Sequence, residues 1–139
     1  MNMQSWTGSI ELNAPRERVF EYLAVPENLI KFWPGIENVH DKEKAPDGGT
    51  RFRWSVKQPD GSVLKGTARD VEFVPGRRIV TLGEGDAYGK VSCSLDGEGD
   101  STSVSMALEY QSAPGIDPAF VENSMRSALA NLKSAVEGR

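Results

Sequence analysis

Residues 117–136 read DPAFVENSMRSALANLKSAV, and this stretch decides the fold because it is the one long helix that the sequence predicts. Asp117 is a favourable N-cap, and Pro118 follows at the first helical position, where its missing N–H costs nothing. Apolar residues then recur at helical spacing as one stripe: Val121, Met125, Ala128, Leu129, Leu132 and Val136. Gly138 supplies a stop signal. A rod of roughly 30 Å results, and its stripe needs an apolar partner of equal length.

The remaining chain supplies that partner as a run of strands. Residues 3–12 alternate in polarity, two short helices are predicted from Pro15 and over about 27–32, and a weakly patterned strand follows at about 36–44. Five turn clusters rich in Pro, Asp and Gly then separate five more segments of strand length; they lie at 46–49, 59–61, 75–76, 83–86 and 96–100. Short turns make consecutive strands antiparallel, so the sequence predicts an α+β domain: a curved antiparallel sheet with helices on one side.

Composition narrows the classes of protein. The chain has 139 residues and a net charge of −4, which suits a single domain over 1–139 and argues against nucleic acid or an anionic membrane surface as a partner. The single cysteine, Cys93, excludes an internal disulfide and fits a reducing compartment. We find no signal peptide and no apolar run long enough to span a bilayer, so we expect a soluble cytoplasmic protein.

Motifs for cofactors and standard catalytic groups are missing. His40 is the only histidine, so a two-histidine metal site is impossible, and no serine lies in a Gly-x-Ser-x-Gly elbow. The glycines at 83–85 fall between strands rather than before a helix, which indicates a hairpin turn and not a dinucleotide loop. We therefore expect no metal and no cofactor.

The strand between the turns at 61 and 75 has two possible registers. An odd register turns Thr67, Arg69, Val71 and Phe73 inward, whereas an even register turns Leu64, Gly66, Ala68 and Asp70 inward. We predict the odd register for the second half, because Val71 and Phe73 need burial, and a bulge near Gly66 could join the two. Arg69 would then point inward, although a position on the exposed face stays open.

Two other polar residues are candidates for the interior. His40 lies a few residues beyond Trp33-Pro34, and Asn131 lies beside the apolar stripe of the long helix; for both, a surface position is the alternative. Small residues at Ser124 and Ala128, on or near the face of the helix toward the sheet, would leave a gap that can serve as a ligand pocket.

Several short motifs, in this order and spacing, resemble the START-like helix-grip superfamily (SRPBCC), and within it the polyketide cyclase/dehydrase branch. They are Ala14-Pro15-x-x-x-Val19-Phe20-x-x-Leu23, Pro26-Glu27-Asn28-Leu29, Trp33-Pro34-Gly35-Ile36, Gly49-Thr50-Arg51-Phe52 and Pro75-Gly76-Arg77-Arg78-Ile79-Val80. The resemblance covers essentially the whole chain. It implies a seven-stranded antiparallel sheet wrapped around the C-terminal helix, with an apolar cavity between them that binds a lipid, an aromatic polyketide or another hydrophobic molecule.

The resemblance also implies site residues. Arg69, His40 and Asn131 occupy places similar to those of polar pocket residues in the aromatic cyclases, although Leu64 and Gly66 stand where the cyclases commonly have aromatic residues. The expected ligand pocket consists of Trp33, His40, Trp54, Arg69, Leu82, Met106, Phe120, Met125 and Asn131.

Two classes of function follow from this pocket. The first is a binding domain for a small hydrophobic, aromatic or lipid-like molecule, including a carrier, a sensor or a chaperone-ATPase-activator-like domain with a protein partner. The second is a cyclase or dehydratase in which Arg69 stabilises an oxyanion and His40 moves a proton. We predict ligand binding as the function and keep catalysis as the alternative.

Overall fold

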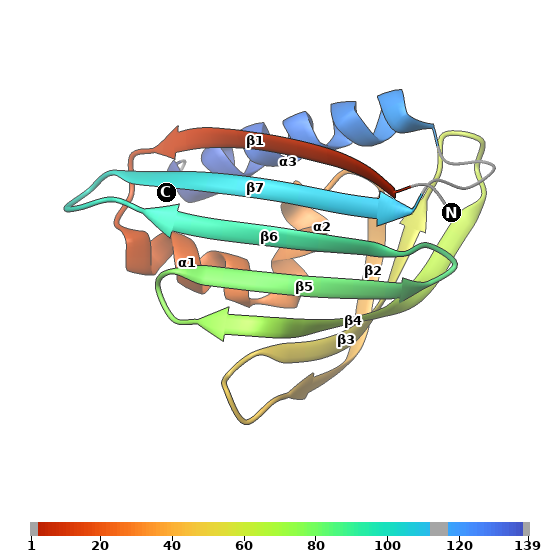
Figure 1. Cartoon of the computed structure of the whole chain (residues 1–139), viewed down its shortest axis with the longest axis horizontal. Helices are drawn as coiled ribbons and strands as arrows, with labels where there is room; N and C mark the ends of the chain where they lie inside the picture. Colours follow the sequence, from red (N-terminus) through yellow and green to blue (C-terminus); the bar gives the residue numbers. More distant parts are fainter. Residues whose placement is uncertain (1–2, 112–116, 138–139) are drawn as a thin grey trace.

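A long C-terminal helix packs against a seven-stranded antiparallel sheet (Figure 1). The structure is a computed structural model that describes residues 3–111 and 117–137. In chain order its elements are β1 (Met3–Leu12), α1 (Arg16–Ala24), the 3-10 helix η1 (Pro26–Asn28), α2 (Leu29–Phe32), β2 (Ile36–Lys44), β3 (Thr50–Lys57), β4 (Val63–Val74), β5 (Arg78–Gly85), β6 (Gly89–Asp96), β7 (Thr102–Gln111) and α3 (Pro118–Glu137). The predicted α+β helix-grip architecture is therefore confirmed.

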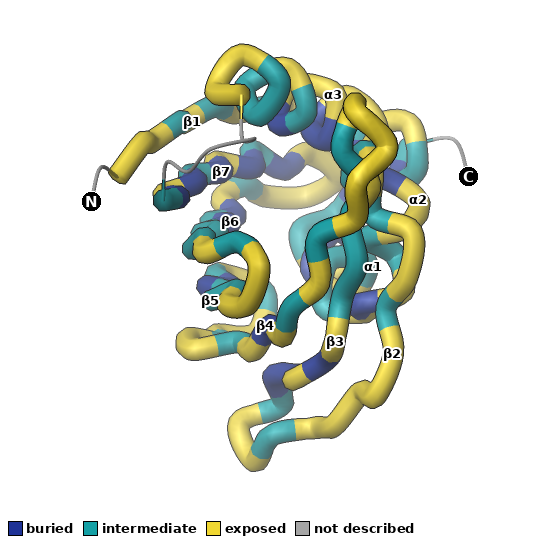
Figure 2. The backbone as a smooth tube through the Cα atoms, turned by 90° about the vertical axis from the view of Figure 1, so that its right-hand side faces the viewer, coloured by how far each residue is buried: buried dark blue, intermediate teal, exposed yellow. Residues whose placement is uncertain are grey.

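The sheet is a meander of six consecutive strands, and β1 forms its edge beside β7. Strands β2 to β7 follow one another as antiparallel neighbours, and β1 pairs with β7, which gives the order β1-β7-β6-β5-β4-β3-β2. Four of the five predicted turns connect these strands, and in two of them Gly61 and Gly76 take φ values of 91° and 76°, which glycine adopts more readily than other residues. The predicted turn at 83–86 is misplaced, because β5 continues to Gly85 and its connection to β6 is residues 86–88. Figure 2 shows the curvature of the sheet, with its edge strands β1 and β2 on opposite sides of the trough and α3 across it.

Helix α3 begins as the sequence predicts. The Ala119 backbone N–H donates to Asp117 Oδ1 at 3.0 Å, so Asp117 caps the helix and Pro118 is its first residue. The predicted stripe faces inward, with these members buried: Met125, Ala128, Leu129, Leu132 and Val136. The predicted stop at Gly138 lies outside the described residues. Burial of the stripe ties α3 to the sheet, since each large apolar side chain contributes about 1.5–3 kcal/mol when fully buried.

The predicted register of β4 is wrong over its middle part. Ala68 is buried and lies opposite Phe52, whereas Arg69 is exposed, so the even positions face the concave side up to Asp70. A β-bulge between Asp70 and Glu72 then shifts the register. Beyond it Phe73 faces the core and meets Phe20 edge to face, with ring centroids 5.2 Å apart.

Val71 takes the bulge position and remains 44% exposed. Our prediction placed the bulge near Gly66 because it required both Val71 and Phe73 to be buried. Only Phe73 meets that requirement, and leaving one valine at the surface costs little because single exposed apolar residues are common.

Candidate functional site

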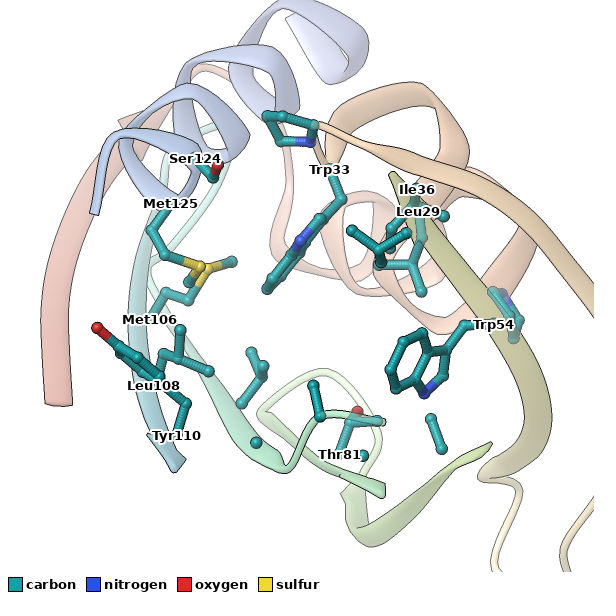
Figure 3. A pocket seen from close by; sticks show the side chains of 18 of the residues that line it. Leu29, Trp33, Ile36, Trp54, Thr81, Met106, Leu108, Tyr110, Ser124 and Met125 are labelled. Atoms are coloured by element: carbon teal, nitrogen blue, oxygen red, sulfur yellow. The ribbon is translucent and has the colours of Figure 1, made fainter. Parts of the chain in front are cut away.

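A cavity of about 270 Å³ lies between the concave face of the sheet, the α1–α2 corner and the first half of α3 (Figure 3). Most of its wall is apolar, and the apolar side chains are Leu23, Ala24, Pro26, Leu29, Phe32, Trp33, Pro34, Ile36, Phe52, Trp54, Val56, Leu64, Ala68, Ile79, Ala87, Val91, Met106, Leu108, Phe120, Val121 and Met125. Such a wall excludes strongly hydrated ligands and favours apolar ones.

Small residues leave this space unfilled. Ala68, Gly83 and Gly89 line the cavity from the sheet, and Ser124 lines it from α3. Of the two small helical residues noted in the sequence, Ser124 borders the cavity, whereas Ala128 packs within the apolar core. The cavity therefore ends part of the way along α3, where large side chains such as Leu132 take over the contact with the sheet.

Two tryptophans project into the cavity, and local structure places both (Figure 3). Trp33 is the C-cap of helix α2, its N–H donates to Leu29 O at 2.8 Å, and Pro34 prevents the helix from continuing. Trp54 lies on β3 with its indole over Gly66, where an added Cβ would come within 2.5 Å of the ring. Gly66 thus provides a flat backbone surface that fixes the Trp54 ring against the cavity wall.

The structure brings together most of the apolar residues that we expected in the pocket. Trp33, Trp54, Met106, Phe120 and Met125 all lie in the cavity wall. That they contact a bound ligand remains a prediction.

Leu82 does not belong to this group. It pairs with Arg69 on the outer, convex face of the sheet, while its neighbours Thr81 and Gly83 line the cavity. Ile79 and Val80 are both buried, so hydrophobicity alone does not reveal which face of β5 is the inner one.

Arg69 also lies on the convex face, which contradicts its predicted place in the pocket. Its side chain is 57% exposed, and its Nη2 lies 4.0 Å from Glu84 Oε1. The cause is the even register of β4, which turns Ala68 and Asp70 inward instead. Arg69 therefore cannot stabilise an oxyanion inside the cavity.

His40 and Asn131 lie outside the cavity wall as well. The His40 side chain is 48% exposed, its Nε2 is 3.8 Å from Asp41 Oδ2, and the residue pairs with exposed Arg53 on the outer face of the sheet. Asn131 Nδ2 donates to the carbonyl oxygen of Phe32 at 3.0 Å. Asn131 thus joins α3 to α2, and His40 has no route to a ligand in the cavity.

Asp70 is a polar residue of the cavity wall that the predicted pocket did not include. Thr81 Oγ1 donates to Asp70 Oδ1 at 2.8 Å, and the Thr50 backbone N–H donates to Asp70 Oδ2 at 2.9 Å. Both Asp70 and Thr81 line the cavity. Burial raises the pKa of Asp70 above its usual value, the two hydrogen bonds oppose that rise, and the charge of Asp47 adds to it. The sequence contained one indication of this position, because the alternative, even register of this strand turns Asp70 inward.

Cys93 lines the cavity from β6 and is buried. Burial raises the pKa of its thiol to about 12, more than the nearby charge of Arg78 lowers it. We expect iodoacetamide to label Cys93 at neutral pH far more slowly in the native protein than in urea, because burial leaves little thiolate in the native protein. Mass spectrometry of the labelled chain measures this, and equal rates in both conditions would show that the native fold does not raise the pKa of the Cys93 thiol.

Two observations concern the described residues as a whole. Within 3–111 and 117–137, no helix combines the length and the apolar character that crossing a membrane requires. In the same ranges, no group of three His, Cys, Asp or Glu side chains is arranged to hold a metal ion.

Comparison with solved structures identifies several proteins with this architecture. The Zhui aromatase/cyclase from Streptomyces sp. R1128 has 18% sequence identity and a TM-score of 0.83, covering 99% of this chain and 96% of its own. A START superfamily protein from Mycobacterium smegmatis has 20% identity and a TM-score of 0.75, covering 97% and 95%. A protein from Chromobacterium violaceum has 22% identity and a TM-score of 0.78, covering 96% of each chain. At these identities the likeness shows the fold.

The family assignment comes from the sequence itself. No curated protein matches the chain significantly. Residues 3–137, however, match the family described as "Polyketide cyclase / dehydrase and lipid transport", which confirms the resemblance seen in the short motifs. Because the match includes every helix and strand described above, the chain belongs to the polyketide cyclase/dehydrase and lipid transport family.

Proposed function

We propose that this protein binds one small hydrophobic molecule in the cavity between the sheet and α3. The observation that carries the proposal is the apolar wall around a cavity of about 270 Å³. Ligand pockets usually measure about 300–1,000 Å³, so this volume, at the lower end, suits a molecule of two or three rings or a short chain. A family that includes lipid transport proteins and a fold shared with an aromatase/cyclase support the same ligand class.

The side chains favour an aromatic ligand within that class. Trp33 and Trp54 offer ring faces and edges from two sides, and Met106 and Met125 place thioether sulfurs near the same space (Figure 3). Aromatic rings pack favourably against both groups, by about 0.5–1.5 kcal/mol beyond the area that they bury.

Binding accounts for the site better than the cyclase or dehydratase alternative. That alternative depended on Arg69 and His40, and both side chains lie outside the cavity. We therefore assign no catalytic step to either residue.

The neutral fluorescent probe N-phenyl-1-naphthylamine tests the proposal. We expect its emission to rise and shift to the blue on addition of the protein, with saturation at one molecule per chain, because the apolar wall removes the probe from water. Native mass spectrometry should show the same 1:1 complex. Absence of saturable binding up to the solubility limit of the probe, by both methods, would overturn the proposed function.

A further inference from the structure

Asp70 is the only acidic or basic side chain in the cavity wall of the described structure. It lies on β4 opposite Thr81 of β5, whose side chain enters the cavity in Figure 3. The rest of the wall is apolar or neutral. Asp70 is therefore the one charged partner that this wall offers to a bound molecule.

The partners of Asp70 are neutral. Thr50 N–H and Thr81 O–H each donate to one carboxylate oxygen, and within residues 3–111 and 117–137 no Lys, Arg or His nitrogen lies in ion-pair distance of it. An ionised carboxylate offers about four acceptor positions, so about half of them stay available after these two bonds. Such a group can accept a further hydrogen bond without losing either existing one.

A purely structural role does not require the charge. The two hydrogen bonds join the start of β3 to β5 through β4, and a neutral asparagine in this position can accept from Thr50 N–H and donate to Thr81 Oγ1. A carboxylate in an apolar wall instead carries a desolvation cost that neutral donors offset only in part. A ligand donor would offset the remainder, because hydrogen bonds to charged acceptors are roughly twice as strong as neutral ones.

We propose that Asp70 is the polar anchor of the ligand: the bound molecule is apolar except for one hydrogen-bond donor, a hydroxyl or an amino group, which it directs at the Asp70 carboxylate. This inference rests on the proposed function and makes it more specific. The wall around Trp33 and Trp54 holds the apolar part, and Asp70 selects among apolar molecules by their donor. Ligands with a carboxylate in the same position are rejected, because two like charges would meet in a desolvated space.

Three ligands with the same ring system test the anchor. We expect 2-naphthol to displace N-phenyl-1-naphthylamine from the wild-type protein at a roughly tenfold lower concentration than naphthalene, and 2-naphthoate to be weaker than naphthalene. A fourth ligand, 2-naphthylmethylamine, distinguishes an ammonium from a hydroxyl donor. Equal affinities for naphthalene and 2-naphthol would overturn the anchor while leaving the proposed function intact, and failure of every ligand and of the probe would overturn both.

Two variants test whether the preference for 2-naphthol over naphthalene depends on Asp70. In Asp70→Asn the preference for 2-naphthol over naphthalene should fall to about threefold or less, while the affinity for naphthalene itself is unchanged and shows that the cavity is intact. Asp47→Asn is the matched control: it removes a neighbouring carboxylate that lies in the turn before β3, outside the cavity wall, and should keep the full preference. A preference that survives in Asp70→Asn would overturn the proposal. If Asp70→Asn does not fold, the ligand series on the wild-type protein still decides.

Discussion

Replacing Leu132 by Asp should prevent the chain from folding. Leu132 is 0% exposed and packs in the core with Leu12, Val19 and Phe20. The substitution removes an apolar side chain, which alone costs about 2–5 kcal/mol, and adds a carboxylate with no partner in the same place. Together, the lost apolar burial and the buried unpaired carboxylate cost as much as the roughly 5–15 kcal/mol by which a typical domain is stable. Far-UV circular dichroism and urea titration measure the result.

Ala130→Asp provides the matched control. Ala130 lies two residues away in the same half of α3 but is exposed, so both variants carry the same unfavourable interaction with the C-terminal end of the helix dipole. The control should unfold cooperatively within about 1 kcal/mol of the wild type. A Leu132→Asp protein with a urea midpoint near that of Ala130→Asp would show that α3 does not bury this face.

Features of the fold that depend on short stretches of sequence could be predicted. Asp117 caps α3 and Pro118 begins it because capping involves only neighbouring residues. The turns at Gly61 and Gly76 follow from the same kind of local chemistry, since the φ values there suit glycine. Once the turns and the long helix are located, short connections leave an antiparallel meander as the simplest sheet.

The register of β4 could not be predicted because it depends on distant residues. Asp70 is held inward by Thr50 of β3 and Thr81 of β5, and the bulge at Val71 follows from that placement. Neither partner is adjacent to Asp70 in sequence. Residues 63–74 contain apolar side chains in both registers, so hydrophobic alternation alone does not distinguish them.

A shift of one residue in the register of β4 changes the chemistry that is expected of the cavity. Arg69 and Asp70 are neighbours on β4, and their partners Leu82 and Thr81 are neighbours on β5, so the odd register brings Arg69 and Leu82 inward together. The observed register brings in Asp70 and Thr81 and reverses the sign of the charge in the wall. The apolar wall residues were less sensitive to this error, because Trp33, Trp54, Met106, Phe120 and Met125 come from other elements.

Filling the cavity from α3 should abolish ligand binding without unfolding the protein. Ser124 lies in the cavity wall between Trp33 and Met125 (Figure 3), and Ser124→Phe would place a ring in the space that we assign to the ligand. We expect the affinity for N-phenyl-1-naphthylamine to fall at least tenfold, a change of about 1.4 kcal/mol in binding free energy. The free energy of unfolding should stay equal or rise, because the new side chain makes dispersion contacts with wall atoms that previously faced empty space.

The opposite direction of the two effects separates this outcome from general damage, since a misfolded variant would lose both affinity and stability. Ser134→Phe is the control: it introduces the same side chain at an exposed position of α3, about 15 Å further along the helix, and should bind the probe like the wild type. Fluorescence titration and thermal unfolding of both variants make the comparison. If Ser124→Phe retains wild-type affinity for the probe, the ligand does not occupy this cavity, and the proposed function would have to be placed elsewhere on the molecule.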